Sequence, residues 1–469
     1  MIHNLKPYSA TKDSGLPWLG DVPQHWDVKR GKVLFDCIDI RSSTGEEELL
    51  TVSSDRGVVP RSSATVTMFK AESYLGYKLC WPGDLVINSL WAWARGLGVS
   101  RHHGIISSAY GVYRLRPPYT EYAAYIHELV RSTPFNWELQ VRSKGIWISR
   151  LQLTDESFLG ASFPLPPPEE QAVIVRFLNY ADRRIWRYIR AKQKLIKLLE
   201  EQKQAIMHSA VTRGLDPNVR VKPSGVEWLG DVPEHWEVRR NGQLFAQRNQ
   251  TGFAELPILE VSLKTGVRVR EFDNTIRKQV MSDRDKYKRA AKGDIAYNMM
   301  RMWQGAVGVA PVDGLVSPAY VVARPLDGVD VRYFSNLFRT SAYMSEVDNC
   351  SRGIVKDRNR LYWEDFKQIR SPYPPPDEQV RIADAINANT HSVNQAIGRT
   401  AQEIDLFREY RTRLIADVVT GKLDVREAAA RLPVEAEEPE PITEVETAAE
   451  ESEHGEGVDV DAVPEEAET

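Results

Sequence analysis

A 22-residue phrase occurs twice in this chain, and that repetition constrains the fold more than any other feature. Residues 14–35 read SGLPWLGDVPQHWDVKRGKVLF, and residues 224–245 read SGVEWLGDVPEHWEVRRNGQLF. Trp18, His25 and Trp26 recur 210 positions later, together with the glycine, aspartate and proline that lie between them. Rare residue types at matched spacing exclude chance, so we infer that a long segment of the chain is duplicated.

The similarity continues through both halves of the chain. Residues 82–114 align with residues 292–324 at the same offset of 210, and Gly83, Asp84 and Trp93 are among the identical positions. We interpret Trp18, Trp26, Gly83, Asp84 and Tyr110 and their copies as core and turn residues, because a position retained in both copies cannot distinguish two targets. The repeat therefore predicts two globular modules of one fold.

Each module is predicted to mix strands and helices, as a mixed α/β (α+β) fold. Short apolar runs bounded by Gly, Pro, Asn and Asp at 84–87, 104–107 and 111–115 are typical of strands and turns. The stretches 119–131 and 331–345 favour helices. The cysteines at 37, 80 and 350 lie far apart without a CxxC motif, so we expect buried thiols rather than disulfides or a metal site.

A different pattern follows each module. After the proline runs at 165–171 and 373–379, apolar residues recur at alternating steps of three and four. This heptad predicts a helix from 169 to about 212 and a second one that ends at Gly421, each roughly 65 Å long. We expect the two helices to pack together, because neither can bury so long a stripe on one module; the alternative is a solitary helix docked on its own domain. The residues predicted to pack are Ile174, Leu178, Ile185, Leu195, Leu199, Ile206, Ile386, Val393, Ile397, Ile404, Phe407 and Leu414.

The charge of the chain is unevenly distributed. Residues 427–469 contain 16 acidic residues and one basic residue, whereas residues 1–426 contain 60 basic and 49 acidic ones. A basic body indicates a polyanionic partner such as nucleic acid, although a solvated surface has the same composition. The acidic segment lacks periodicity, so we predict a disordered tail.

With no apolar run that could span a membrane and no signal peptide, we expect a cytoplasmic protein without a membrane partner.

The sequence offers little for catalysis. It contains no phosphate-binding loop, dinucleotide fingerprint, zinc-protease motif or nucleophile elbow, so we expect a non-catalytic chain with no metal and no cofactor of its own. Two alternatives remain open at this point. One is a self-contained DNA methyltransferase or nuclease, and the other is a coiled-coil scaffold that binds only proteins.

Specificity is expected where the two copies diverge. The first such segment contains Trp91 and Arg95, which are replaced by Arg301 and Gly305, and arginine or glutamine side chains there suit guanine or adenine edges. The second comprises 142–150 and 351–360, whose basic residues suit phosphates. The third comprises 53–61 and 262–270. The predicted DNA-binding residues are Trp91, Trp93, Arg95, Arg101, His102, Lys144, Arg150, Lys264, Arg268, Arg301, Trp303, Gln304, Arg352, Lys356 and Arg358.

Together the repeated motifs resemble those of the specificity subunit of type I restriction-modification systems. WLGDVPQHW and WLGDVPEHW open the modules, PLPPPEEQ and PYPPPDEQ precede the helices, and VTRGLD and VTGKLD close them. The resemblance spans residues 14–424 and implies a first target recognition domain at 1–162, a central helix at 163–216, a second target recognition domain at 217–371 and a distal helix at 372–426. The acidic tail, 427–469, falls outside it.

The resemblance also implies a mechanism and partners. Each target recognition domain would read one half of an asymmetric, bipartite site in double-stranded DNA, and the helices, paired antiparallel in a pseudo-twofold arrangement, would set the gap. Two modification subunits would bind S-adenosylmethionine and methylate adenine, and two restriction subunits, in systems that have them, would use ATP and Mg.

Overall fold

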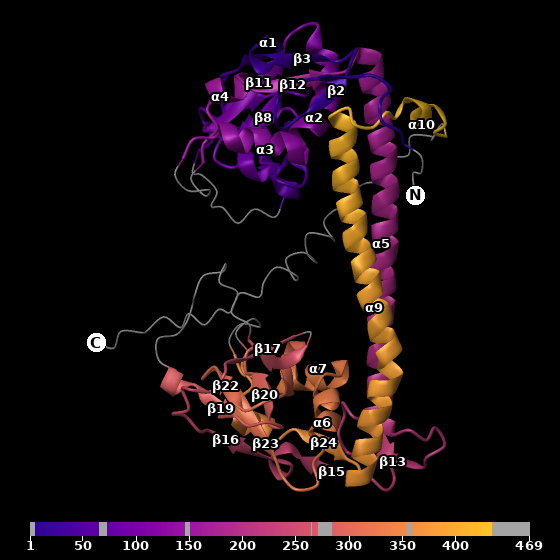
Figure 1. Ribbon diagram of the computed structural model, residues 1–469. Coiled ribbons are helices and arrows are strands. Elements are labelled where there is room, and N and C mark those ends of the chain that lie inside the picture. Colours follow the sequence, from indigo (N-terminus) through magenta and orange to yellow (C-terminus); the bar gives the residue numbers. More distant parts are fainter. Residues whose placement is uncertain are drawn as a thin grey trace, which may run out of the picture. The chain divides into compact units, whose positions relative to one another are not determined.

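The computed structural model describes residues 5–64, 73–145, 151–263, 265–270, 284–353 and 359–433. The chain divides into two compact units, Met1–Ile189 with Asp405–Thr469, and Arg190–Ile404. Each unit holds one module together with part of both long helices, α5 and α9 (Figure 1).

The first module is built around a four-stranded antiparallel sheet in the order β4-β11-β8-β9. Its register places Val112 of β11 opposite Val86 of β8, and both side chains are fully buried. The sheet strands are β4 (Phe35–Cys37), β8 (Leu85–Asn88), β9 (Leu97–Val99) and β11 (Tyr110–Leu115). The paired strands are β1 (Thr11–Asp13) with β2 (Asp21–Pro23), β3 (Asp27–Arg30) with β12 (Ser162–Leu165), β5 (Leu50–Ser53) with β6 (Gly57–Pro60), and β7 (Lys78–Cys80) with β10 (Gly104–Ile106). The helices are α1 (Gly31–Leu34), α2 (Ala123–Arg131), α3 (Thr133–Arg142) and α4 (Asp155–Leu159).

The second module repeats this topology. Its four-stranded sheet has the order β16-β23-β20-β21, which matches the first sheet strand for strand. These strands are β16 (Phe245–Arg248), β20 (Ile295–Asn298), β21 (Val307–Val309) and β23 (Tyr320–Pro325). The pairs are β13 (Val221–Pro223) with β14 (Asp231–Pro233), β15 (Glu237–Arg240) with β24 (Arg370–Tyr373), β17 (Leu259–Ser262) with β18 (Gly266–Val269), and β19 (Lys288–Ala290) with β22 (Gly314–Val316). The helices are α6 (Val331–Phe338), α7 (Ser341–Cys350) and α8 (Trp363–Phe366).

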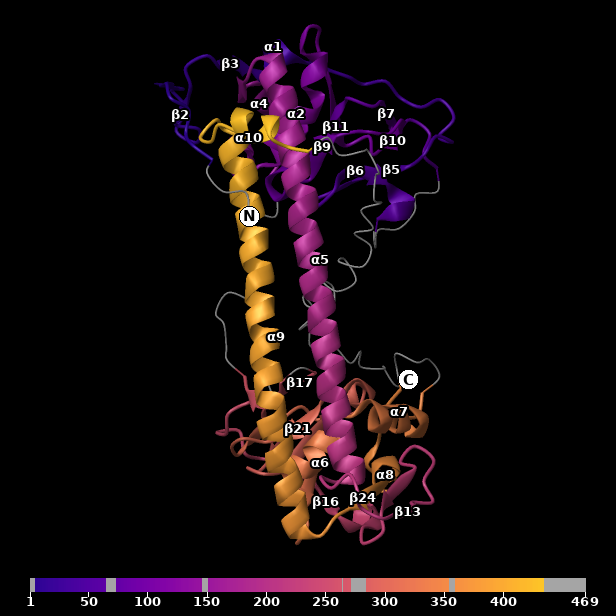
Figure 2. The same ribbon diagram turned by 90° about the vertical axis from the view of Figure 1, so that its right-hand side faces the viewer.

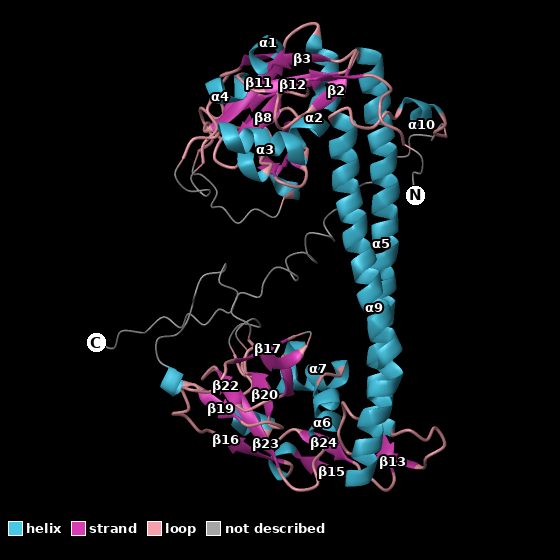
Figure 3. Ribbon diagram, viewed as in Figure 1, coloured by secondary structure: helices cyan, strands magenta, loops and turns pink. Residues whose placement is uncertain are grey.

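The mixed α/β prediction is confirmed, and both modules combine strands and helices (Figure 3). Two local predictions are wrong. The stretch predicted as one helix at 331–345 is divided at Thr340, whose hydroxyl accepts a hydrogen bond from the Tyr343 N–H and begins α7 as its N-cap. Cys37, predicted to be buried, is exposed, whereas Cys80 is buried.

Repeated aromatic residues fasten each module to a long helix. Trp26 is fully buried and packs edge-on against Tyr125, whose hydroxyl donates to the main-chain oxygen of Val419 at 2.9 Å. In the second unit Trp236 packs on Tyr333, which donates to the oxygen of Val211 at 2.8 Å. Trp26 and Trp236 are therefore core residues, as predicted, whereas Trp18 and Trp228 are half-buried.

The two long segments are helical throughout. α5 (Pro168–Arg213) has 46 residues and α9 (Pro376–Val419) has 44, close to the predicted bounds. In the first unit the two helices lie side by side (Figure 2), with Tyr188 stacked on Phe407 and Asp182 paired with Arg411. Residue numbers rise along α5 as they fall along α9, so the helices are antiparallel. In the second unit Lys192 pairs with Glu403 at 2.6 Å.

The predicted seam is only partly buried. Its buried members are Ile174, Leu178, Ile185, Ile386, Val393, Ile404 and Leu414, and its half-buried ones are Leu199, Ile206, Ile397 and Phe407. Leu195 is 40% exposed, so its assignment to the packed seam is wrong. A straight helix drifts about 20° per heptad from a strict 3.5-residue repeat, and Leu195 lies three heptads beyond Ile174.

The end of the chain also differs from the expectation. The acidic tail was predicted to begin at 427, but a short helix, α10 (Arg426–Ala430), buries Ala429. Residues 434–469, the rest of the predicted tail, lie outside the described residues. Within the described ranges, no helix is both long and apolar enough to cross a lipid bilayer.

Candidate nucleic-acid interface

The loop between β8 and β9 presents one large side chain on a fixed backbone. The Trp91 N–H donates to the Asn88 oxygen, and the Trp91 oxygen accepts from the Gly96 N–H, both at 2.9 Å. The Trp91 side chain is 58% exposed. The matching loop of the second module repeats the turn and exposes Arg301 instead. The two modules thus offer an aromatic ring and a guanidinium at the same place.

The tryptophan shared by both loops has a different environment. Trp93 Nε1 donates to the Leu90 oxygen at 3.0 Å, and Trp303 Nε1 donates to the Met300 oxygen at 2.9 Å. The indole N–H, the single polar group of each of these side chains, therefore donates a hydrogen bond within its own loop. This favours a role in shaping the loop over a role in base recognition.

Arg95 adopts a backbone conformation that is rare for a residue with a side chain. Its φ is +60°, and Gly305, with a φ of +92°, stands at the same place in the second module. The Arg95 guanidinium donates to the Thr133 hydroxyl at 2.9 Å. The neighbouring Gln304 is exposed in the second module.

The second divergent segment lies beside this loop. Lys144 and Gln152 exchange main-chain hydrogen bonds of 2.9 Å, and the next residue, Leu153, donates its N–H to the Ser89 oxygen at 2.9 Å. In the second module Arg352 pairs with Arg360, and Leu361 donates to the Met299 oxygen. Residues 64 positions apart in the first module and 62 positions apart in the second are thus joined by a main-chain hydrogen bond.

The third divergent segment, the turn between β5 and β6, packs against β9, the strand that the same loop enters. A Cβ atom on Gly98 would lie 3.1 Å from the Gly57 Cα, so the two backbones meet where a side chain would not fit. Gly308 and Gly266 make the same close approach in the second module. We call the bridged pair of segments at Lys144–Gln152, and its counterpart at Arg352–Arg360, the hairpin base. The loop, the hairpin base and the turn of each module together form what we name its divergent surface. It comprises the described residues within 53–61, 89–102 and 144–153 in the first module, and within 262–270, 299–312 and 352–361 in the second.

Some of the predicted cations on these surfaces have acidic partners. Arg268 pairs with Glu260, which lies directly opposite it in the β17–β18 register, and Arg352 pairs with Asp365. Arg101 and Lys144 are exposed and His102 is half-buried. The predicted contacts Arg150, Lys264, Lys356 and Arg358 lie outside the described residues.

A buried aspartate in each module is paired with an arginine of the four-stranded sheet. Arg114 holds Asp84 with two hydrogen bonds of 2.8 Å, and Asp84 is 2% exposed. Arg248 holds Asp294 in the same way in the second module. The repeated aspartate was predicted as a turn residue, and its carboxylate also accepts the Trp81 N–H at 2.9 Å. Its arginine partner comes from a different strand in each module, so the sequence repeat did not reveal it.

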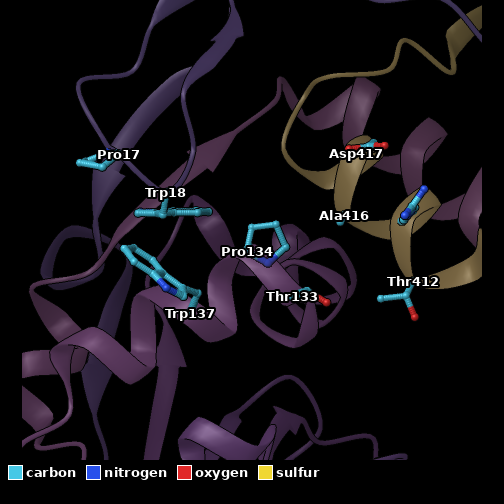
Figure 4. A pocket seen from close by; sticks show the side chains of 9 residues that line it. Pro17, Trp18, Thr133, Pro134, Trp137, Thr412, Ala416 and Asp417 are labelled. Atoms are coloured by element: carbon cyan, nitrogen blue, oxygen red, sulfur yellow. The ribbon is translucent and has the colours of Figure 1, made fainter. Parts of the chain in front are cut away.

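The described residues show no grouping suited to metal chemistry. Within them, no three His, Cys, Asp or Glu side chains lie close enough together to hold a metal ion. An open pocket of about 470 Å³ in the first unit is lined by Trp18, Pro134 and Trp137 on the module and by Thr412 and Ala416 on α9 (Figure 4). Its lining is mainly apolar, and the charged residues in it are Arg413 and Asp417.

The comparisons with known proteins agree on one kind of relative. A chain in a structure concerned with complex assembly and conformational transition of the type I R-M system matches with a TM-score of 0.60 at 16% identity, over 86% of this chain and 99% of that one. A Methanocaldococcus jannaschii protein assigned as the type I restriction enzyme MjaX specificity subunit is 22% identical over 87% of this chain and 96% of its own length. The type I restriction enzyme MjaVIII specificity subunit of the same organism is 21% identical over 61% and 68%. No protein-family model matches the chain.

Proposed function

We infer that this chain belongs to the specificity subunits of type I restriction-modification systems and recognises DNA by sequence. The observation that carries this function is the convergence of the divergent segments. In each module the loop and the hairpin base that differ between the copies are hydrogen-bonded to each other, and the turn that differs packs closely against the strand that the loop enters, all on a sheet that the copies share. A common scaffold with different presented side chains is what two related readers of different half-sites require.

The divergent surfaces favour different modes of reading. An exposed guanidinium such as Arg301 can donate two hydrogen bonds to a guanine edge in the major groove. The exposed Trp91 ring has a large apolar face, which suits a thymine methyl group or a base step. We therefore propose that each module reads one half of an asymmetric bipartite target.

The helices fit the role of spacer and docking element. We propose that α5 and α9 set the gap between half-sites and carry two modification subunits, with restriction subunits joining in systems that have them. S-adenosylmethionine would then bind the modification subunits, and ATP and Mg the restriction subunits, while this cytoplasmic chain itself is non-catalytic. The similarity to a chain from a type I R-M assembly supports this arrangement.

Exchange of one divergent loop tests the function. The chain is co-expressed with its modification subunits, and methylated adenines are mapped in the host DNA. Replacing residues 299–313 with the sequence of residues 89–103 should change one half of the methylated site and leave the other half intact. A change in both halves or in neither would contradict the proposal.

Two further measurements separate the alternatives. Binding of S-adenosylmethionine by the isolated chain would support a self-contained methyltransferase. Equal affinity of the complex for all DNA sequences would support a scaffold that binds only proteins. We expect neither result.

A further inference from the structure

One partly buried arginine ties together two parts of the divergent surface in the first module. Arg131, the last residue of α2, donates from Nη2 to the main-chain oxygens of Ser54 and Asp55, at 2.7 and 2.6 Å. Its Nη1 donates to the oxygen of Leu97 at 2.7 Å, with longer contacts of 3.4 and 3.5 Å to those of Ser53 and Arg95. The five acceptors belong either to the end of β5 and the β5–β6 turn or to the loop before β9 and the first residue of β9.

The second module contains the same connection. Arg339, which follows α6, donates from Nη2 to the Leu263 oxygen at 2.7 Å and from Nη1 to the Val307 oxygen at 3.2 Å. Leu263 occupies the β17–β18 turn and Val307 begins β21, the counterparts of Ser54 and Leu97. Two modules that differ on their presented side chains therefore retain one arginine with the same two kinds of acceptor.

The chemistry of the contact requires an arginine. A planar guanidinium donates in several directions at once and can hold carbonyl groups from two chain segments, whereas a lysine ammonium is a compact charge on a flexible stem. Burial lowers the pKa of Arg131 to about 10, and burial also lowers the pKa of Arg339. Charges that have lost water in this way depend on the carbonyl dipoles around them.

The position of each arginine couples the scaffold to the reading loops. Arg131 stands at the end of a helix that packs on β9, and its bonds fix the turn of the third divergent segment against the loop of the first. Base recognition by hydrogen bonds requires that the donor and acceptor atoms of the protein lie within about an ångström of their correct positions at the base edge. A change in the relative position of turn and loop would therefore misplace side chains such as Trp91 without removing any of them.

We propose that Arg131 and Arg339 are positioning residues for base recognition, each setting the shape of the divergent surface in its own module. The proposal rests on the function inferred above, and it deepens that function. Neither arginine contacts DNA in this proposal. Each controls discrimination at one half-site only.

The test replaces each arginine with lysine in the full chain, in complex with its modification subunits. Arg131→Lys keeps the positive charge but loses the planar guanidinium that donates in several directions. We therefore expect roughly tenfold weaker discrimination between the correct sequence and single-base variants at the half-site that the first module reads. Discrimination at the other half-site should be unchanged. Arg339→Lys should weaken discrimination at the half-site that the second module reads and leave the first half-site unchanged. If Arg131→Lys fails to assemble, Arg339→Lys still tests the proposal, because this substitution disrupts fewer of the hydrogen bonds described above.

A matched control and three outcomes complete the design. Arg116→Lys changes an arginine of the first module that bonds to Asp36 and to the Lys32 oxygen, and it should leave both half-sites unaffected. Unchanged discrimination in both arginine variants, or an equal loss at both half-sites in either of them, would overturn the inference. If the unmodified complex itself shows no sequence preference, the proposed function fails instead.

Discussion

Trp26 donates its indole N–H to the carboxylate of Glu170 at 3.1 Å, although the two residues are 144 positions apart. Tyr8 donates to the same carboxylate at 2.5 Å, and His25 lies 2.6 Å from its second oxygen. In the second unit one oxygen of Glu378 accepts the Trp236 indole N–H at 3.1 Å and lies 2.8 Å from His235 Nε2. The phrase that opens each module thus binds the first turn of the long helix that follows it.

Replacement of Glu170 should destabilise the first unit. Its carboxylate is 6% exposed and serves three partners, and Glu170→Gln both removes the charge and introduces an N–H donor among groups that donate. We expect the free energy of unfolding to fall by about 2–3 kcal/mol. Thermal unfolding of the full chain measures it, with Glu169→Gln, an exposed neighbour in the same turn, as the control. Equal midpoints for the two variants would refute this role of Glu170.

The opening phrase shows what the sequence could predict and what it could not. Repetition identified Trp26 and Trp236 as core residues, and both are fully buried. Their partners, Glu170 and Glu378, were not identified from the sequence. Side-chain contacts between segments so far apart in sequence depend on the folded arrangement, and no local pattern reports them.

Arg95 should combine a role in DNA binding with a cost in stability. A left-handed backbone costs a residue with a side chain roughly 1 kcal/mol, so Arg95→Gly should be more stable than Arg95→Ala by about that amount. Both variants lose the guanidinium and should weaken DNA binding equally. If Arg95 contacts a phosphate, the slope of log affinity against log salt should fall by about 1 in each.

Chemical denaturation and DNA binding at several salt concentrations measure these two effects separately. Gly305→Ala serves as the matched variant in the second module, where a φ of +92° predicts a loss of about 1 kcal/mol. Unaltered DNA binding in both Arg95 variants would remove Arg95 from the recognition surface. Equal stability of the glycine and alanine variants would contradict the backbone argument.

The helical seam should be stabilising only where it is buried. Ile185 is 5% exposed and Leu195 is 40% exposed, although one heptad pattern predicted both to pack. We expect Ile185→Ala to lower the free energy of unfolding by about 2–4 kcal/mol and Leu195→Ala by less than about 1 kcal/mol. Denaturant unfolding of the full chain compares them. Similar losses for both substitutions would indicate that Leu195 is buried in solution.

The same comparison marks the limit of a periodic pattern. The ends of α5 and α9 were predicted well, because residues that begin and end helices, such as proline and glycine, occur there in the sequence. The heptad repeat did not correctly predict every contact between α5 and α9, since the period of a straight helix differs from 3.5 residues. The divergent segments were likewise recognised from the sequence, but their joining through Leu153 and Arg131 was not.

His127 should make the first module sensitive to acid. Its Nδ1 accepts the Val99 N–H at 3.2 Å, and burial together with the charges of Arg131 and Arg101 lowers its pKa to about 3. An unfolded histidine has a pKa near 6.5, so between pH 6.5 and about 3 the unfolded state binds a proton that the folded state does not. Stability therefore falls as the pH falls through this range, by up to about 2 kcal/mol at pH 5 from this one group.

His127→Gln should remove that part of the pH dependence while keeping a side-chain acceptor for Val99. The measurement is the thermal midpoint of the variant and of the unmodified chain from pH 8 to pH 4.5. Above pH 7.5 histidine is neutral in both states, so the difference between the two proteins should be constant there. Below pH 6.5 the midpoint of the unmodified chain should fall more steeply than that of the variant. Parallel curves over the whole range would show that His127 takes up a proton without unfolding of the module.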